Sequence, residues 1–437
     1  MLDSGRMPPQ PIESAPVPLQ GGGGEDSLHF RPGPIVAVGV MASVLKVVIA
    51  LTSLGSNDVL AFYQFAKAVD THGLTWLYEH SILFNHPPLI GYLLAALARL
   101  EHLPFLQQNG LTFPFFLRLP GIIADFVVLL LVLSVVRRYP RLRPPRWALF
   151  LFAASPVSIM ITGFHGNTDP ILVLFLLLAS ITAVDGRPAL CGLSLALACQ
   201  VKIIPLLVLP FFFLFWVERR RTCLFLGWFL VSSIIFCLEP LLKAPVVFAK
   251  NVLAYGSFWG VWGVTYCLRI TGLSEFNKTS FFNLSASQNA IITILKITVV
   301  LGILILALRR RKLPAPALFA SIGYAWMIFF VFSPGVAAQY LVWLAPFVLF
   351  LSPTFYGFLV AGSSVFLFAL YTITSGGFPW YFAHASNKLS AICAHWALIP
   401  WLTLLGGLIA FGLNARRRNP HFRFLSLQAI QPATISE

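Results

Sequence analysis

Side chains that can transfer protons are concentrated in residues 55–88. This segment holds three of the chain's 15 acidic residues and three of its nine histidines. They are Asp58, Asp70, Glu79, His72, His80 and His86. Because ionisable groups are rare in this apolar chain, their gathering in one polar segment predicts a site of chemistry outside the membrane.

Asp58 follows directly after an apolar run, in the sequence SNDVLAFYQF. A carboxylate at the membrane surface can take a proton from an acceptor hydroxyl, so Asp58 is a candidate catalytic base. Asp is also a preferred helix N-cap, and Asp58 could instead cap a helix that contains residues 62–69. The residue by itself does not decide between these two roles.

The sequence FHGNTDP (164–170) places His165, Asn167 and Asp169 within five residues. Gly-Asn and Asp-Pro are turn formers, and Asp169 could cap the helix that follows. Three polar side chains exceed what a turn requires at membrane depth, where such groups are costly. A substrate-binding role is therefore favoured over a simple turn.

Two further motifs carry polar groups at the ends of apolar runs. Lys202 in VKIIP lies beside a proline break and suits a cation directed at a phosphate, although snorkelling to the interface would also explain it. Gln339 and Tyr340 in FSPGVAAQYLVW begin an apolar run. Tyr340 would also fit an interfacial aromatic belt, whereas Gln339 favours substrate binding.

The composition indicates a polytopic membrane protein. The chain is 58% hydrophobic and 10% charged, with a mean hydropathy of +0.83, whereas soluble domains carry about 25% charged residues. The net charge of +15 comes from short basic runs between apolar segments, which orient helices and do not indicate nucleic-acid binding. The six cysteines form no CxxC pair and are interpreted as packing residues.

We expect an all-α fold of about 12 transmembrane helices with an outer catalytic loop after the first helix. The expected segments are 35–54, 115–136, 147–163, 170–184, 189–202, 204–217, 223–240, 290–308, 316–332, 339–352, 355–374 and 392–413. Several are shorter than the roughly 20 residues of a straight span, which suggests incomplete helices around a cavity. Residues 89–104 are interpreted as an interfacial or re-entrant helix.

The basic runs at 137–146, 218–221, 309–312 and 416–418 should face the cytosol, which places both termini there. We divide the chain into a disordered cytosolic tail (1–33), a transmembrane domain (34–415) and a basic cytosolic tail (416–437). The protein should lie in the cell membrane if it is bacterial and in the endoplasmic reticulum membrane if it is eukaryotic.

The long loop 241–289 is rich in aromatic residues, which could bind a sugar or lipid headgroup or form an amphipathic surface helix. No Walker loop, no GxGxxG motif and no zinc-ligand spacing is present, which argues against nucleotide-driven transport. No cofactor is expected and no residues are assigned to a metal; a divalent ion is compatible with the sequence but not indicated.

The order of these motifs resembles that of the GT-C glycosyltransferases, polytopic enzymes that use polyprenyl-phosphate sugars. The likeness covers about residues 35–350 and is greatest to the first mannosyltransferase of glycosylphosphatidylinositol (GPI) synthesis. Related members have two acidic residues in the first loop, separated by one residue. This chain has Ser56-Asn57-Asp58 there, so only the second acidic residue of that pair is present. The motifs that carry the likeness are Asp58, Tyr63, NHPPL (85–89), RLPGIIADFVVLLLVL (118–133), HGNTD (165–169), VKIIPLLVLP (201–210) and QYLVWLAPF (339–347).

This resemblance implies an inverting hexosyltransferase, with mannose favoured, that acts on the outer or lumenal face of the membrane. Asp58 would deprotonate the acceptor, and Lys202 would stabilise the leaving lipid phosphate. The residues that would bind the substrates are His165, Asn167, Asp169, Lys202, Gln339 and Tyr340.

The implied partners are a polyprenyl-phosphate sugar donor, a glycan or glycolipid acceptor, membrane lipid and, as an optional component, a small membrane subunit; nucleic acid is not expected. Two other hypotheses stay open. A secondary transporter or flippase for a lipid-linked glycan would also have broken helices and a buried cation. A structural subunit without activity predicts that Asp58 is dispensable.

Overall fold

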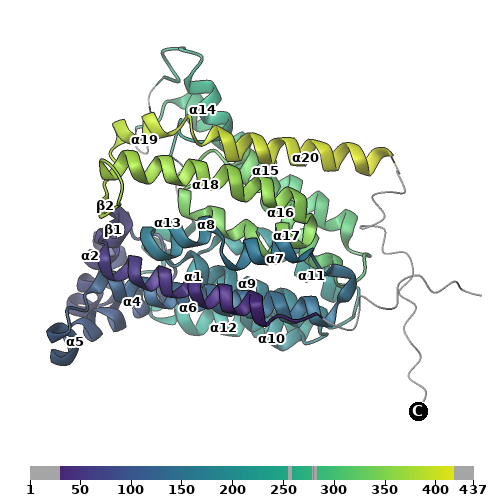
Figure 1. Ribbon diagram of the computed structural model, residues 1–437, viewed down its shortest axis with the longest axis horizontal. Coiled ribbons are helices and arrows are strands. Elements are labelled where there is room, and N and C mark those ends of the chain that lie inside the picture. Colours follow the sequence, from purple (N-terminus) through teal and green to yellow (C-terminus); the bar gives the residue numbers. More distant parts are fainter. Residues whose placement is uncertain (1–29, 254–257, 278, 280–282, 418–437) are drawn as a thin grey trace, which may run out of the picture.

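The computed structural model describes residues 30–253, 258–277, 279 and 283–417. Within these residues the architecture is all-helical, apart from a two-residue parallel pairing of β1 (Gly55–Ser56) with β2 (Phe382–Ala383). The long helices run along one axis of the molecule, and β1 and β2 lie together at one end of the bundle (Figure 1). The expected tails fall almost wholly outside the described residues.

Six helical segments of the described part have the length and composition to cross a membrane. They are α1 (Gly33–Thr52), α6 (Phe113–Arg138), the segment Arg146–His165, α12 (Thr222–Lys243), α15 (Ala286–Arg310) and α18 (Pro353–Ser375). The segment Arg146–His165 is built from α7 (Arg146–Ala153), α8 (Pro156–Ser158) and the π-helix η2 (Ile159–His165). The chain is therefore a multi-pass membrane protein.

Six further apolar segments are shorter than these spans. They are α9 (Asp169–Val184), α10 (Pro188–Val201), η3 (Ile204–Val208) with α11 (Leu209–Val217), α16 (Ala317–Phe332), η4 (Ala338–Leu344) with α17 (Ala345–Leu351), and the apolar part Leu398–Leu413 of α20 (Leu398–Arg417). The twelve segments expected from the sequence overlap these six long and six short segments, and the six long ones have the length and composition of a span. Proline and a change to 3-10 geometry shorten several of them, as at Pro205 between α10 and α11.

Short helices surround the end of the bundle that carries β1. They are α2 (Asn57–His72), α3 (Leu74–His80), α4 (Pro88–Glu101), α5 (Pro104–Gln108), α13 (Pro245–Leu253), α14 (Gly263–Arg269) and α19 (Asn387–Cys393). Helix α4 packs against α2 at this end (Figure 1). Its 14 residues would extend about 21 Å, which is too short for a straight span.

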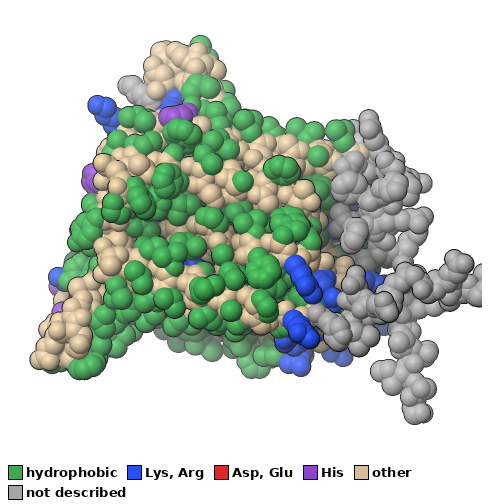
Figure 2. All heavy atoms as spheres, viewed as in Figure 1, with side chains coloured by type: hydrophobic (Ala, Val, Ile, Leu, Met, Phe, Trp, Pro, Cys, Tyr) green, Lys and Arg blue, Asp and Glu red, His purple; other side chains and the backbone are tan. Residues whose placement is uncertain are grey.

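The other end of the bundle carries basic side chains. There the 3-10 helix η1 (Pro140–Leu142) lies in the arginine-rich connection between α6 and α7. Figure 2 shows hydrophobic side chains over the middle of the visible face and Lys or Arg side chains at the end where α1 begins. This separation agrees with a charge-oriented membrane protein.

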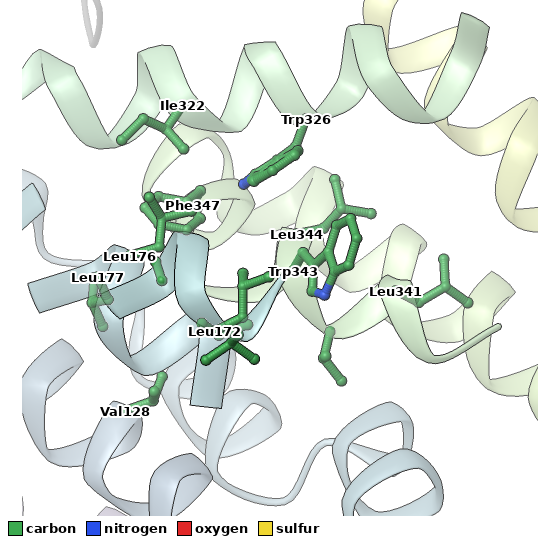
Figure 3. Packing of buried hydrophobic residues seen from close by; sticks show 14 of the residues in the cluster. Val128, Leu172, Leu176, Leu177, Ile322, Trp326, Leu341, Trp343, Leu344 and Phe347 are labelled. Atoms are coloured by element: carbon green, nitrogen blue, oxygen red, sulfur yellow. The ribbon is translucent and has the colours of Figure 1, made fainter. Parts of the chain in front are cut away.

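One buried hydrophobic cluster connects most of the helices, including α9, α16 and η4. Trp326 on α16 and Trp343 on η4 are buried with their ring centroids 5.5 Å apart. Figure 3 shows the Trp326 ring above the Trp343 ring, with Leu172 of α9 below and to the left of Trp343. Segment η4 is therefore held from both sides, which places Gln339 and Tyr340 at a defined position on the β1 side of the core.

Candidate functional site

A cavity of about 630 Å³ opens beside α2, where five of the seven predicted site residues meet. These five are Asp58, Asn167, Lys202, Gln339 and Tyr340. The remaining two, His165 and Asp169, contact them from behind. Residues separated by up to 281 positions in the sequence are therefore brought into one site.

Asp58 is directed at the cavity and does not serve as the N-cap of α2. Ser56 is the N-cap, and its hydroxyl accepts a hydrogen bond from the Asp58 backbone N–H at 3.3 Å. The Ser56 hydroxyl also donates to the His165 carbonyl at 2.8 Å, which ties the start of α2 to the end of η2. The carboxylate of Asp58 is thus available for other contacts.

Three side chains converge on one carboxylate oxygen of Asp58. Oδ2 accepts from Asn167 Nδ2 at 2.6 Å and from Gln339 Nε2 at 3.0 Å. His165 Nε2 lies 3.2 Å from the same oxygen, and His165 Nδ1 lies 3.1 Å from the Tyr371 hydroxyl. One imidazole tautomer satisfies both contacts, with Nε2–H donating to Asp58 and Nδ1 accepting from Tyr371.

This environment keeps Asp58 ionised. Burial acts to raise the pKa of Asp58, but the hydrogen bond from His165, the charge of Lys202 and the hydrogen bond from Asn167 lower it below its usual value. The site therefore presents a fixed negative charge that is already oriented by three donors.

Lys202 and Asp169 form a buried ion pair next to the cavity. Lys202 Nζ donates to both carboxylate oxygens of Asp169 at 2.9 Å, and Trp343 Nε1 donates to Oδ1 at 2.6 Å. The same ammonium lies 4.4 Å from the centroid of the Tyr340 ring, which is within the range of a cation–π contact. Lys202 is therefore positioned by its partners and does not snorkel to the interface.

Irregular backbone at two glycines brings the site segments together. Gly166 follows the π-helix η2 with φ +78°, and a Cβ there would lie 2.5 Å from Val59 Cγ2. Gly55 has φ +101°, and a Cβ there would lie 2.3 Å from Arg118 Nη2. Both conformations favour glycine, and π-helical turns frequently occur at functional sites.

Arg118 is a buried cation that sequence reasoning missed. Its Nη1 donates to the carbonyls of Ala50 and Ser53 at 3.0 Å, so the guanidinium caps the end of α1. The signal was present in the RLPG motif, because an arginine inside an apolar helix needs a specific partner. Arg118 supports the chain just before Asp58.

The segment 55–88 contributes fewer groups to the site than its composition suggested. Asp70 pairs with Arg99 at 2.8 Å, on the protein surface. His72 and His80 flank the ring of Trp76, outside the residues that line the cavity.

Asn85 and His86 do line the cavity. Burial and the charge of Lys202 lower the pKa of His86 to about 3, so its imidazole is neutral at pH 7.

Aromatic residues of the loop 241–289 are mainly structural where they are described. Trp259 and Trp262 are buried, and Trp262 Nε1 donates to the Phe330 carbonyl at 2.7 Å. Neither of the expected roles, a ring surface for sugars or a surface helix, applies to these two residues. Tyr255 lies outside the described residues.

Comparison with known proteins identifies a family. The family model for the GPI transamidase subunit PIG-U matches residues 66–304, which is more than half of the chain. The matched region includes Asn167 and Lys202, whereas Asp58 and Gln339 lie outside it. A search of the curated proteins found no match.

This match overturns the expected activity. The matched family is not a glycosyltransferase family, so the inverting hexosyltransferase with a polyprenyl-phosphate sugar donor and a sugar acceptor was wrong, and so was the flippase alternative. Broken apolar helices and rare polar residues build a membrane cavity, and similar motifs can do so without the same reaction. The chain belongs to the family of the GPI transamidase subunit PIG-U.

Proposed function

We propose that this protein holds the headgroup of a GPI glycolipid in the cavity beside Asp58, as a substrate-binding subunit of a transamidase-type complex. The family description supplies the class of substrate, since a GPI transamidase acts on glycosylphosphatidylinositol. The cavity supplies the place. Its volume of about 630 Å³ is within the usual range for a ligand pocket.

The mixed lining of the cavity is the observation that carries this proposal. Asp58, Asn167 and Gln339 present carboxylate and amide groups, which match the hydroxyls of a sugar. Phe62, Phe65 and several aliphatic residues line other parts of the same cavity. A headgroup with both hydroxyls and a lipid attachment would satisfy both kinds of surface.

The lining favours binding over nucleophilic catalysis. Among the described residues that border the cavity there is no cysteine, and the serine, Ser333, donates to the Gly335 carbonyl at 2.8 Å. A nucleophile needs an adjacent base or a lowered pKa. We therefore assign Asp58 and its three donors to recognition of the substrate.

The proposal includes an orientation. We infer that all twelve apolar segments cross or enter the bilayer, that both termini lie in the cytosol, and that the cavity faces the opposite side. Basic side chains gather at the far end of the bundle from β1 (Figures 1 and 2), which supports this orientation. The likeness to GT-C enzymes then concerns the arrangement of helices and the cavity.

Binding of a GPI glycolipid by the purified protein tests the proposal. Native mass spectrometry of the detergent-solubilised protein would compare wild type with Asp58→Asn and Asp58→Ala. Asn keeps a neutral acceptor, so we expect about a tenfold loss of affinity, which corresponds to 1.4 kcal/mol. Ala leaves three donors without their acceptor, so a larger loss is expected.

Asp70→Asn is the matched control, because Asp70 lies on the same helix α2 but contacts Arg99 away from the cavity. It should bind like wild type. Equal binding by wild type, Asp58→Ala and Asp70→Asn would reject the cavity as the glycolipid site.

A further inference from the structure

The cavity extends to the exposed surface of α15, one of the helices with the length and composition of a membrane span. Lys296, Val299 and Val300 all line it, and their spacing places them on one face of that helix. Three lining residues are also widely exposed: Leu83 (58%), Leu253 (66%) and Val300 (50%). Leu83 and Leu253 lie at the β1 end, and Val300 lies on the spanning helix α15. The exposed lining residues therefore mark an opening on the side of the molecule, where the β1 end adjoins the spanning helices.

Lys296 is an unusual residue for its position. It is exposed and lies ten residues after Ala286, the first residue of α15, which corresponds to about 15 Å along the helix. A lysine in the central part of a spanning helix costs about 2.5–3.5 kcal/mol on insertion scales. Because Cβ atoms point toward the helix N-terminus, its side chain is directed toward the β1 side of the membrane.

We propose that Lys296 forms a phosphate-binding subsite for a membrane lipid at the lateral opening of the cavity. This inference rests on the proposed function and adds the position of the lipid phosphate. In a phosphoglycolipid the phosphate joins the glycan to the lipid anchor. Lys296 correspondingly borders both the polar lining around Asp58 and the exposed apolar lining.

Charge complementarity supports a phosphate at this place. The charged side chains that line the cavity are two lysines, Lys202 and Lys296, and one carboxylate, Asp58. An anionic phosphate would complement this excess of positive charge, and a hydrogen bond between two charged groups is stronger than one between neutral groups. The apolar side chains of Val300 and Leu253 would contact the lipid chains.

The experiment uses lipids that lack a GPI glycan. A negative result therefore rejects the phosphate subsite without rejecting the proposed binding of a GPI headgroup. Native mass spectrometry would titrate the full-length protein with dioleoyl phosphatidylinositol and with glucosyl dioleoylglycerol, which has a sugar and no phosphate. Lys296→Met keeps an unbranched side chain without charge. We expect it to lose phosphatidylinositol binding at least tenfold and to keep glucosyl dioleoylglycerol binding.

Lys296→Arg should bind phosphatidylinositol within a few-fold of wild type, since it keeps the charge. Lys250→Met is the control, because Lys250 is exposed on α13 and does not line the cavity. If Lys296→Met and wild type bind phosphatidylinositol equally, Lys296 only snorkels and the subsite is rejected. If Lys296→Met is poorly folded, Lys296→Gln replaces it and must show the same selective loss for the phosphate-bearing lipid.

Discussion

Two lysine–aspartate pairs lie inside the helical bundle, in different surroundings. Lys202 and Asp169 meet where α10 ends and α9 begins, next to the cavity of about 630 Å³. Lys46 and Asp125 pair in the middle of the continuous helices α1 and α6. The cavity that Asp125 lines has a volume of about 30 Å³. Under the proposed function, the ion pair that borders space for a ligand is the functional one.

The Lys46–Asp125 pair is completed by a hydroxyl. Ser158 Oγ accepts from Lys46 Nζ at 2.7 Å and donates to Asp125 Oδ2 at 2.6 Å. The three residues come from α1, α6 and α8, so the cluster fastens three membrane segments to one another. Its position and its small cavity point to a structural role.

The largest effect is expected from breaking the Lys46–Asp125 pair. Lys46→Met leaves a carboxylate with Ser158 as its remaining partner, which should lower the free energy of unfolding by about 3–5 kcal/mol. The double variant Lys46→Met/Asp125→Leu should recover most of this loss and bind the GPI glycolipid like wild type. Unfolding in mixed SDS micelles measures the first effect, and native mass spectrometry measures the second.

A smaller loss of stability is expected at Lys202, accompanied by a loss of binding. Lys202→Met should cost about 2–3 kcal/mol, because Trp343 still donates to Asp169 and the large cavity admits water. Lys202→Met/Asp169→Leu should recover stability but still bind the glycolipid at least tenfold more weakly. Full recovery of binding by this double variant would show that neither ion pair is needed for binding and that Lys202 is not part of the site.

The sequence predicted the helices better than it predicted the partners of the polar groups. Apolar segments follow directly from hydropathy, and Lys202 was noticed because Pro205 interrupts its helix. Lys46 and Asp125 are charges inside apolar helices, so each signals that it needs a partner. No local pattern shows which partner it is before the fold brings α1 and α6 together. The donors to Asp58 lie 107 to 281 positions away, which no local pattern reveals.

The activity was mispredicted for a related reason. The motifs HGNTD, VKIIP and QYLVW place Asn167, Lys202 and Gln339 around one cavity, and this placement is what the resemblance detected. A cavity of this kind can hold a lipid-linked glycan for different reactions. The residues that would distinguish the reactions, including a nucleophile, are not encoded in these motifs.

The pH dependence of stability distinguishes the large cavity from the small one. His86 lines the large cavity, and its folded pKa of about 3 lies below the usual value of 6.5. A histidine with a lowered pKa contributes stability that is present above the unfolded pKa and is lost as pH falls from 6.5 toward 3. Between pH 7 and pH 5 we expect a loss of about 2 kcal/mol.

His86→Asn should lose less stability than wild type over this pH interval. Asp58 does not affect this comparison, because its pKa is lowered from 3.8. Its contribution to the free energy of unfolding is therefore lost only below the pH interval from 7 to 5. Lys46→Met/Asp125→Leu should show the same pH dependence as wild type. Identical pH profiles for wild type and His86→Asn would contradict a neutral, buried His86.

The smallest effect concerns the cavity beside Asp125. The buried hydroxyls of Tyr356 and Ser363 line this cavity. Neither hydroxyl forms a hydrogen bond within the described part of the chain, although Tyr356 lies near Ser155. A volume of about 30 Å³ exceeds the 10–15 Å³ that one water needs, and water here would have several hydroxyl partners.

We therefore expect Tyr356→Phe to lower the free energy of unfolding by about 1 kcal/mol, the usual value of one hydrogen bond. The same substitution should leave glycolipid binding unchanged, since Tyr356 does not line the large cavity. An unchanged or raised stability of Tyr356→Phe would mean that the small cavity is dry. A loss of glycolipid binding would instead show that the two cavities are coupled. It would contradict the assignment of one ion pair to structure and the other to ligand binding.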